Sequence, residues 1–249
     1  MITGCYAFSV AWMIRLWQSD TAMKILVINA VILALLAPLS FGQNADEEKP
    51  KKVGLLKMIE QKKKRGLMLA TVNNAKQLFY LLVEFDSDFG EFPSDATAKE
   101  SKDLNAYTGK HSNDYLGQFI AGGYTKSEEI FYVPGASKTK KKPDSDTATK
   151  AKTLEAGECG FTYVAGMSTS SHSGRPLLCA PMTGKGTKFD PEPLGGRAVV
   201  LRIDGAVKTY EINENGDVVL PNGKKLFETG ADTVWGENGF DQEMLKFPK

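Results

Sequence analysis

The stretch LMLATVNNAKQLFYLLVEFDSDFGEFP, residues 67–93, carries the clearest secondary-structure pattern in the chain. Its apolar residues recur every three or four positions, which places them along one side of a helix. They are Met68, Val72, Ala75, Phe79, Leu82, Phe85 and Phe89. Gly90 then supplies a C-terminal stop signal, and Pro93 prevents the helix from continuing. The pattern therefore predicts one long amphipathic helix.

The segments that follow this helix predict shorter elements. A short helix is expected at 113–120 and a short strand at Glu129–Val133. Residues 137–153 are rich in charge and poor in apolar side chains, which predicts an exposed, mobile loop. Farther on, the spacing changes to the alternation of strands, within residues 159–167, 175–182 and 217–220.

The clearest hairpin pattern is RAVVLRIDGAVKTYEI, residues 197–212. Two alternating segments flank Asp204-Gly205, a pair that suits a type I′ turn. An antiparallel meander of these strands, packed on the long N-terminal helix, gives an α+β fold. Residues 67–249 are expected to form this one domain.

The N-terminal part of the chain has the pattern of an export signal. Lys24 precedes the apolar run Ile25–Leu36, and Pro38 breaks the run before small residues at Ser40 and Gly42. This order is typical of a cleavable signal peptide, with the cut between Gly42 and Gln43. Four segments are therefore expected: a leader from an upstream start at 1–22, the signal peptide at 23–42, a charged linker at 43–66, with the frayed start of a helix as the alternative for 44–64, and the domain at 67–249.

An uncleaved membrane anchor at 25–42 is the alternative, because this uncharged stretch is at the lower length limit for a membrane span. The formal net charge of +1 provides no field that would attract nucleic acid or an anionic membrane. Two cysteines, Cys159 and Cys179, lie outside the leader. In an oxidising compartment they are expected to form one disulfide, with free buried thiols as the alternative.

Three segments resemble, in their order, bacterial type IV pilin-like proteins, especially the major pseudopilin of type II secretion systems. They are ATVNNAKQLFYLLVEFDSDFGEFPSD at 70–95, NDYLGQFIAGGYTKSEEIFYVPGA at 113–136 and GGRAVVLRIDGAVKTYEI at 195–212. The resemblance covers residues 67–219 and implies a pilin-like globular domain. The long apolar assembly helix of the family is missing, and Thr71 stands where the family has Glu. The resemblance thus implies a pilin-like domain that travels on an ordinary secretion signal.

Candidate chemistry is sparse. His172 lies among the serines of STSSHSG, residues 168–174, but adjacency in sequence does not align a hydroxyl with an imidazole, and a flexible polar loop explains the segment. Cys159, His172 and Cys179 could supply zinc ligands, although the paired spacing of zinc sites is absent.

Calcium is the other metal to consider. NENGD at 213–217 places oxygen ligands at Asn213, Asn215 and Asp217, in a loop that differs from an EF-hand and that a turn at Asn215-Gly216 also explains. The resemblance favours calcium here, because pseudopilins bind it near their C-terminal loops. No cofactor is otherwise expected.

These features predict a non-enzymatic, exported protein, periplasmic or extracellular, that acts through protein contacts at the cell envelope and is linked to a type II secretion or pilus-like system. Its partners are expected to be envelope or secretion-system proteins, without nucleic acid, and the membrane only if the signal segment is retained. Two alternatives remain: a membrane-anchored pseudopilin subunit of a secretion filament, and a secreted hydrolase that uses His172 and a neighbouring serine.

Overall fold

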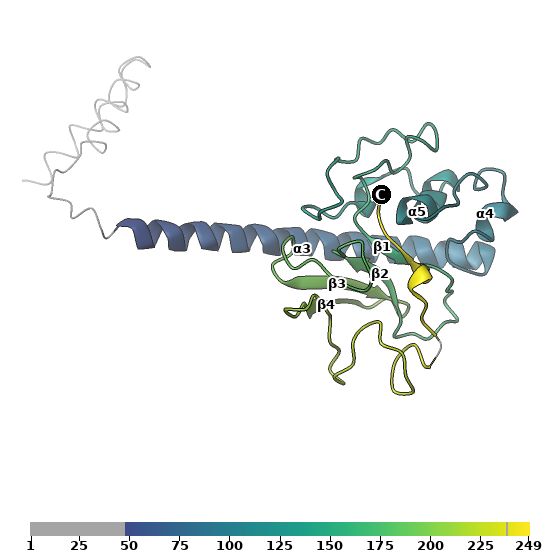
Figure 1. The fold of residues 1–249 in the computed structure, drawn as a ribbon. Coiled ribbons are helices and arrows are strands. Elements are labelled where there is room, and N and C mark those ends of the chain that lie inside the picture. Colours follow the sequence, from purple (N-terminus) through teal and green to yellow (C-terminus); the bar gives the residue numbers. More distant parts are fainter. Residues whose placement is uncertain (1–47, 238) are drawn as a thin grey trace, which may run out of the picture. The chain divides into compact units, whose positions relative to one another are not determined.

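A computed structural model describes residues 48–237 and 239–249. The expected leader, the signal peptide and its cleavage position between Gly42 and Gln43 lie outside the described residues. Residues Val53–Lys249 form one compact unit, which contains every strand described. The elements are, in chain order, α3 (Glu48–Phe89), α4 (Thr97–Glu100), α5 (Ser112–Ala121), the 3-10 helix η1 (Glu129–Phe131), β1 (Thr162–Val164), β2 (Pro176–Ala180), β3 (Arg197–Arg202), β4 (Val207–Glu211), the 3-10 helix η2 (Gln242–Met244) and β5 (Leu245–Lys246) (Figure 1).

Helix α3 contains the predicted long helix and ends at Phe89, as predicted. Gly90 terminates it with a φ of 77°, and its N–H donates to the Asp86 carbonyl at 2.7 Å. The helix is longer than expected at the other end, since residues 48–66, predicted to be a charged linker, are helical. Lysine and glutamate are good helix formers, and Glu60 pairs with Lys64 one turn later, at 3.2 Å.

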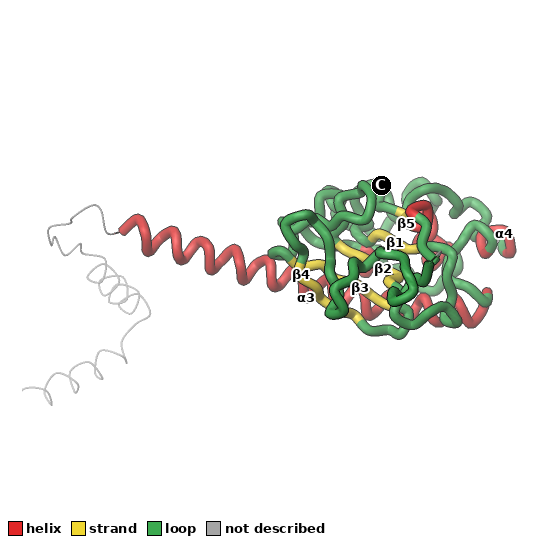
Figure 2. Tube along the Cα trace, turned by 60° about the horizontal axis from the view of Figure 1, so that its bottom comes forward, coloured by secondary structure: helices red, strands yellow, loops and turns green. Residues whose placement is uncertain are grey.

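The sheet has five antiparallel strands in the order β4-β3-β2-β1-β5 (Figure 2). Strands β1 to β4 form the predicted meander, and β5, from the end of the chain, pairs with the free edge of β1. Leu78 and Leu82 of α3 belong to the same buried core as Leu178 of β2 and Val200 of β3. The predicted α+β class is therefore confirmed, with α3 contributing one side of the core.

Two predicted strands are wrong or incomplete. Glu129–Val133 begins with the 3-10 helix η1, in which the N–H of Tyr132 donates to the Glu129 carbonyl at 3.2 Å. The side-chain amide of Asn74 also donates to the carbonyls of Glu129 and Tyr132, at 3.0 and 2.9 Å, and this holds the turn against α3. Residues 217–220 make only isolated bridges, such as Ile212 with Val218, because tight turns on both sides leave too little chain for a ladder.

The segment 137–153 contains no helix or strand, in line with the predicted loop, but its two ends are fixed. The hydroxyl of Thr139 is buried and donates to the Val133 carbonyl at 2.6 Å. At the other end, the Tyr107 hydroxyl donates to the Thr153 hydroxyl at 3.1 Å. Most residues between these points are exposed.

The hairpin between β3 and β4 has a different turn from the one predicted. A type I′ turn requires a positive φ at both central residues. Gly205 has a φ of 78°, but the φ of Asp204 is not positive. The N–H of Gly205 donates to the Arg202 carbonyl at 3.0 Å, and the N–H of Arg202 donates to the Ala206 carbonyl at 3.1 Å. This is a three-residue loop in which glycine takes the left-handed position.

We expect Gly205→Ala to destabilise the protein by about 1–3 kcal/mol, because the left-handed conformation disfavours a side chain and the new methyl would meet a ring. A Cβ at this position would lie 2.6 Å from the Phe79 ring of α3. Gly223→Ala is the matched control, since Gly223 has a φ of 80° and nothing within 4 Å of its Cβ position. Urea denaturation should show a larger loss for Gly205→Ala, and equal losses would contradict this packing.

Candidate functional site

The exposed side of α3 carries most of the large apolar side chains that the described part of the protein leaves in solvent. The exposed residues of this kind are Leu55, Leu56, Met58, Ile59, Leu69, Tyr80, Val83 and Val219. All except Val219 lie on α3, and Tyr80 is 72% exposed. Large apolar patches on soluble proteins mark interaction surfaces more often than isolated exposed residues do.

Most of these residues lie in one row. Met58, Leu69 and Tyr80 are eleven residues apart, close to three helical turns, so they lie on the same side of α3. Leu55 lies three residues before this set and Val83 three residues after it. We call these five residues the α3 stripe. The stripe lies opposite the buried side formed by residues such as Leu78 and Leu82.

The sequence pattern at 67–93 predicted only the buried side of the helix, because the apolar residues of the α3 stripe are eleven residues apart rather than three or four. The eleven-residue spacing from Met58 to Tyr80 is the signal that identifies the second apolar side. Basic residues accompany it: Lys62 and Arg65, four and seven residues after Met58, lie on the same side of the helix as the α3 stripe, whereas Lys57 and Lys64 lie on other sides. The hydrogen bond from Lys64 to Glu60 is the main cause of the raised pKa of Lys64. The N-terminal part of the α3 stripe is therefore both apolar and basic.

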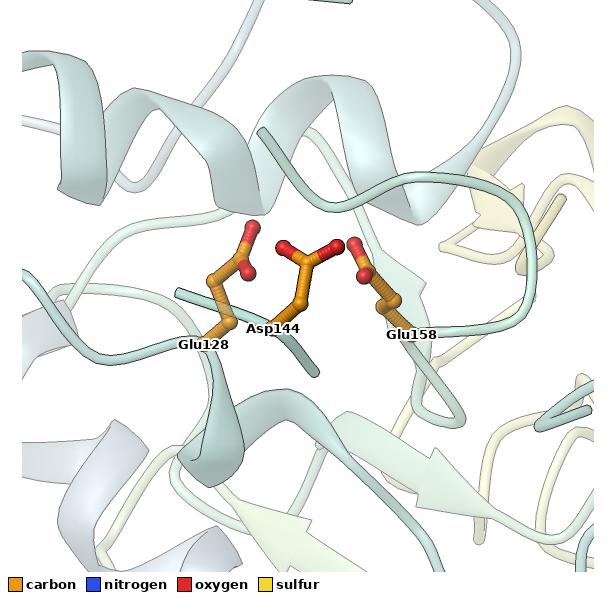
Figure 3. A group of neighbouring side chains, drawn as sticks. All are labelled: Glu128, Asp144 and Glu158. Carbon is orange, nitrogen blue, oxygen red and sulfur yellow. The ribbon is translucent and has the colours of Figure 1, made fainter. Parts of the chain in front are cut away.

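A second feature is a cluster of three carboxylates, Glu128, Asp144 and Glu158 (Figure 3). Glu128 precedes η1, Asp144 lies in the 137–153 loop, and Glu158 precedes β1. One oxygen from each group lies within 4.8 Å of the others. Glu128 and Glu158 are buried, whereas Asp144 is exposed. Sequence reasoning missed this cluster because its members are far apart in the chain and only the fold brings them together.

Glu128 fixes the backbone around the cluster. Its carboxylate accepts the N–H of Leu154 at 2.7 Å and that of Ser145 at 3.1 Å. These two donors are also the non-glycine residues with a positive φ in the described part of the chain, at 46° and 61°. Burial raises the pKa of Glu128, against the effect of the two N–H groups, and the nearby charge of Glu158 adds to the rise.

Lys141 lies beside the cluster. Its Nζ is 2.6 Å from Glu155, 2.9 Å from Asp144 and 3.0 Å from Glu158. Its hydrogen bond with Glu155 is the main cause of the raised pKa of Lys141, and the same ammonium lowers the pKa values of Asp144 and Glu155. Lys152 also approaches Glu155, at 3.4 Å. The result is a network with more carboxylates than ammonium groups.

The structure holds Cys159 and Cys179 as free, buried thiols rather than as the expected disulfide. Cys179 pairs across the sheet with Thr162 and Val200, so Cys159 is not its cross-strand neighbour. The Cys159 sulfur instead lies 3.5 Å from the Ser112 hydroxyl. Burial raises the pKa of Cys159 to about 11 and that of Cys179 still higher, so both thiols stay protonated at neutral pH.

His172 is exposed whereas the two thiols are buried, and among the described residues these three possible zinc ligands do not form a group close enough to hold a metal ion. Its Nδ1 accepts the N–H of Gly174 at 3.1 Å. The Ser170 hydroxyl instead forms a hydrogen bond with the Ser168 hydroxyl at 2.7 Å, and the Ser171 hydroxyl accepts the N–H of Ser168. Among the described hydrogen bonds, none joins His172 to a serine hydroxyl, and this segment offers no aligned nucleophile and base.

The calcium candidates of the 213–217 loop are engaged in other contacts. Asn213 Oδ1 accepts the N–H groups of Asn215 and Asp217, at 3.0 and 2.9 Å, which forms the turn. The carboxylate of Asp217 binds Lys188 at 2.8 Å and Lys225 at 3.0 Å. Burial acts to raise the pKa of Asp217, but these two ammonium groups outweigh it and the pKa is lowered. The side-chain oxygens of Asn213 and Asp217 therefore already have partners within the protein.

Two further findings bear on function. In the part of the chain that the structure describes, no helix combines the length and the apolar character needed to cross a membrane. Comparison with known protein families, with curated proteins and with solved structures gives no match to this chain.

Proposed function

We propose that this chain is an exported, non-enzymatic protein whose pilin-like domain acts through protein contacts at the cell envelope, in a type II secretion or pilus-like system. The α3 stripe is the observation that carries this proposal, because large apolar side chains that recur along one exposed side of a helix, with the charged Lys62, Arg65 and Lys76 between them, suit contact with another protein. The order of long helix, loops and antiparallel meander supports the pilin-like part, together with the resemblance of residues 67–219. Export rests on the signal pattern of residues 23–42.

The expected partner surface is an apolar helix face with charges of its own. Residues that repeat along one side of a helix are spaced for a helix–helix or helix-in-groove contact. The N-terminal part of the α3 stripe is basic, whereas Glu84 and Asp88 lie near its C-terminal end. The surface of a partner protein can carry charges that complement this change from positive to negative charge along the helix. A uniformly anionic lipid surface would match only the basic part, and this favours a protein partner.

Site-specific photo-crosslinking in the cells that make the protein tests this proposal. A photoreactive side chain at Leu69 or at Tyr80 should give the same envelope-protein adduct, identified by mass spectrometry. Met58→Glu should reduce its yield about tenfold, because it places a charge in the apolar contact. The stability of the chain should change by less than about 0.5 kcal/mol, since Met58 is exposed.

Val219 supplies the control position, as an exposed apolar residue that is not on α3. Equal adduct yields at Val219, or no adduct at Leu69 and Tyr80, would contradict a contact surface on α3. An adduct between two copies of this chain would mean that the α3 stripe mediates self-association rather than contact with an envelope protein.

A further inference from the structure

We propose that a groove beside the β3–β4 hairpin binds a small organic acid, in which one carboxylate is attached to an apolar group. The groove has a volume of about 570 Å³, within the range of about 300–1,000 Å³ that is typical of small-molecule sites. Its lining residues come from segments 172–174, 202–210 and 220–234. None of them lies on α3, so the groove is separate from the α3 stripe and the inference goes beyond the function proposed for that stripe.

The register of the hairpin places two cationic side chains on one face of the sheet. Lys208 pairs with Val200 across the ladder, and Tyr210 pairs with Ala198. Because side chains alternate along a strand, Arg202, two residues after Val200, lies on the same face as these four residues. Arg202 and Lys208 are therefore diagonal neighbours, a spacing of about 7–8 Å that long side chains can span. One carboxylate can contact both cationic groups.

The charges at the groove leave one positive charge without a partner. Arg202 pairs with Asp204 of the same hairpin, at 2.5 Å. Lys208 is exposed and belongs to no described ion pair, and no carboxylate is among the residues that line the groove. A carboxylate brings one negative charge, which matches this balance, whereas a phosphate group brings about 1.5 to 2. The charge balance therefore favours a carboxylate as the anionic group of the ligand.

Asp204 does not use all the donors of Arg202. It contacts Nη2, whereas Nε is buried without a hydrogen-bond partner among the described residues. Nη1 makes no described hydrogen bond either, and it is not a buried atom, so a ligand can reach it. His172 adds a donor, because its Nδ1 accepts the N–H of Gly174 and Nε2 then carries the proton of the neutral ring. With the Lys208 ammonium, three side chains of the groove have donors that a carboxylate can satisfy.

The groove also has an apolar wall that is in place without a ligand. The apolar side chains of this wall are Leu220, Pro221, Leu226 and Val234. The N–H of Leu226 donates to the Val218 carbonyl at 3.0 Å, and its carbonyl accepts the indole N–H of Trp235 at 2.9 Å. Arg175 Nε donates to the Val234 carbonyl at 3.0 Å. Because these bonds hold the wall, an apolar group attached to the carboxylate can bury its surface there without reordering the loop.

Titration of the purified full chain with octanoate, followed by backbone NMR signals, tests the site. Octanamide is the matched neutral ligand, since it has the same apolar chain without the charge. We expect octanoate to shift the signals of residues 172–174 and 202–210, and octanamide to bind at least about tenfold more weakly. Raising sodium chloride from about 0.02 M to about 0.3 M should weaken the binding of octanoate and leave that of octanamide unchanged.

Lys208→Glu should weaken octanoate binding at least about tenfold, because it places a like charge beside the carboxylate. Lys208→Gln, which only removes the charge, should weaken it about threefold and keeps the test decisive if the first variant does not fold. Lys126→Glu is the matched control, since Lys126 is exposed, does not line the groove and changes the net charge equally. It should bind octanoate as the wild type does.

Four results would overturn the proposal. They are no binding of octanoate by the wild type, equal binding of octanoate and octanamide, equal losses in Lys208→Glu and Lys126→Glu, and signal shifts confined to α3. The second would mean apolar contact alone, the third a general effect of net charge, and the fourth binding at the α3 stripe.

Discussion

Replacing Phe85 with alanine is expected to lower the free energy of unfolding by about 3–5 kcal/mol, the range for large-to-small changes at fully buried aromatic residues. Phe85 is fully buried on α3. Its ring stacks on Phe89 at a centroid distance of 4.4 Å and meets Phe119 edge-on at 5.5 Å and Tyr124 at 5.3 Å. The substitution removes all three aromatic contacts and leaves a cavity. Urea denaturation measures the loss.

Tyr80→Ala is the control for this experiment, since it removes an aromatic ring of similar size from the same helix. Tyr80 is 72% exposed, so its replacement should change stability by less than about 0.5 kcal/mol. A similar loss in both variants would mean that the two sides of α3 are not distinguished by packing. A loss below about 1 kcal/mol for Phe85→Ala would mean that α3 does not contribute this side of the core.

The sequence predicted the elements whose formation depends on local pattern. The C-terminal end of α3 was predictable because Gly90 is a local stop signal, and the β3–β4 hairpin because alternation on both sides of Asp204-Gly205 defines it. The turn type was not predictable from that pair alone, since the same two residues suit a two-residue or a three-residue loop. A two-residue turn would be closed by a hydrogen bond from the N–H of Ala206 to the Ile203 carbonyl, whereas here the N–H of Gly205 donates to the Arg202 carbonyl.

Features that depend on distant residues could not be predicted in the same way. The 3-10 helix at residues 129–131 is held against α3 by Asn74, whose side-chain amide donates to the carbonyls of Glu129 and Tyr132. The carboxylate cluster likewise needs Glu128 and Glu158 to be brought together by the fold. The α3 stripe was a different kind of omission. The eleven-residue spacing of its residues is visible in the sequence, but it is a second apolar pattern on a helix whose buried side already has a stronger one.

Gln118 of α5 shows how strongly one buried side chain can depend on such distant partners. It is fully buried, and its amide group donates to the carbonyls of Ser94 at 2.9 Å and Tyr107 at 3.0 Å. Its carbonyl oxygen accepts the hydroxyl of Thr97 at 2.7 Å. One side chain thus joins three segments, and both of its polar ends have partners. An oxygen cannot replace the amide nitrogen, because that position faces two acceptors.

We therefore expect Gln118→Glu to destabilise the protein by about 3–5 kcal/mol at neutral pH, through an unpaired buried charge that faces two carbonyl oxygens. Desolvation and these carbonyls should raise the folded-state pKa of the new carboxyl above its unfolded value of about 4.3. Below about pH 4.3 the group is protonated in both states, and the loss should fall to about 1 kcal/mol. The loss should grow as pH rises toward the folded-state pKa and then stay constant.

Urea denaturation of the wild type and Gln118→Glu at several pH values between about 4 and 8 measures this dependence. Gln77→Glu is the control, because Gln77 is exposed on α3 and the same change there should cost less than about 0.5 kcal/mol at every pH. A loss for Gln118→Glu that is independent of pH would mean that the new carboxyl reaches solvent in the folded state. In that case Gln118 would not join Ser94 and Tyr107 in an interior that excludes solvent. Helix α5 would then pack more loosely on its two neighbouring segments than the hydrogen bonds indicate.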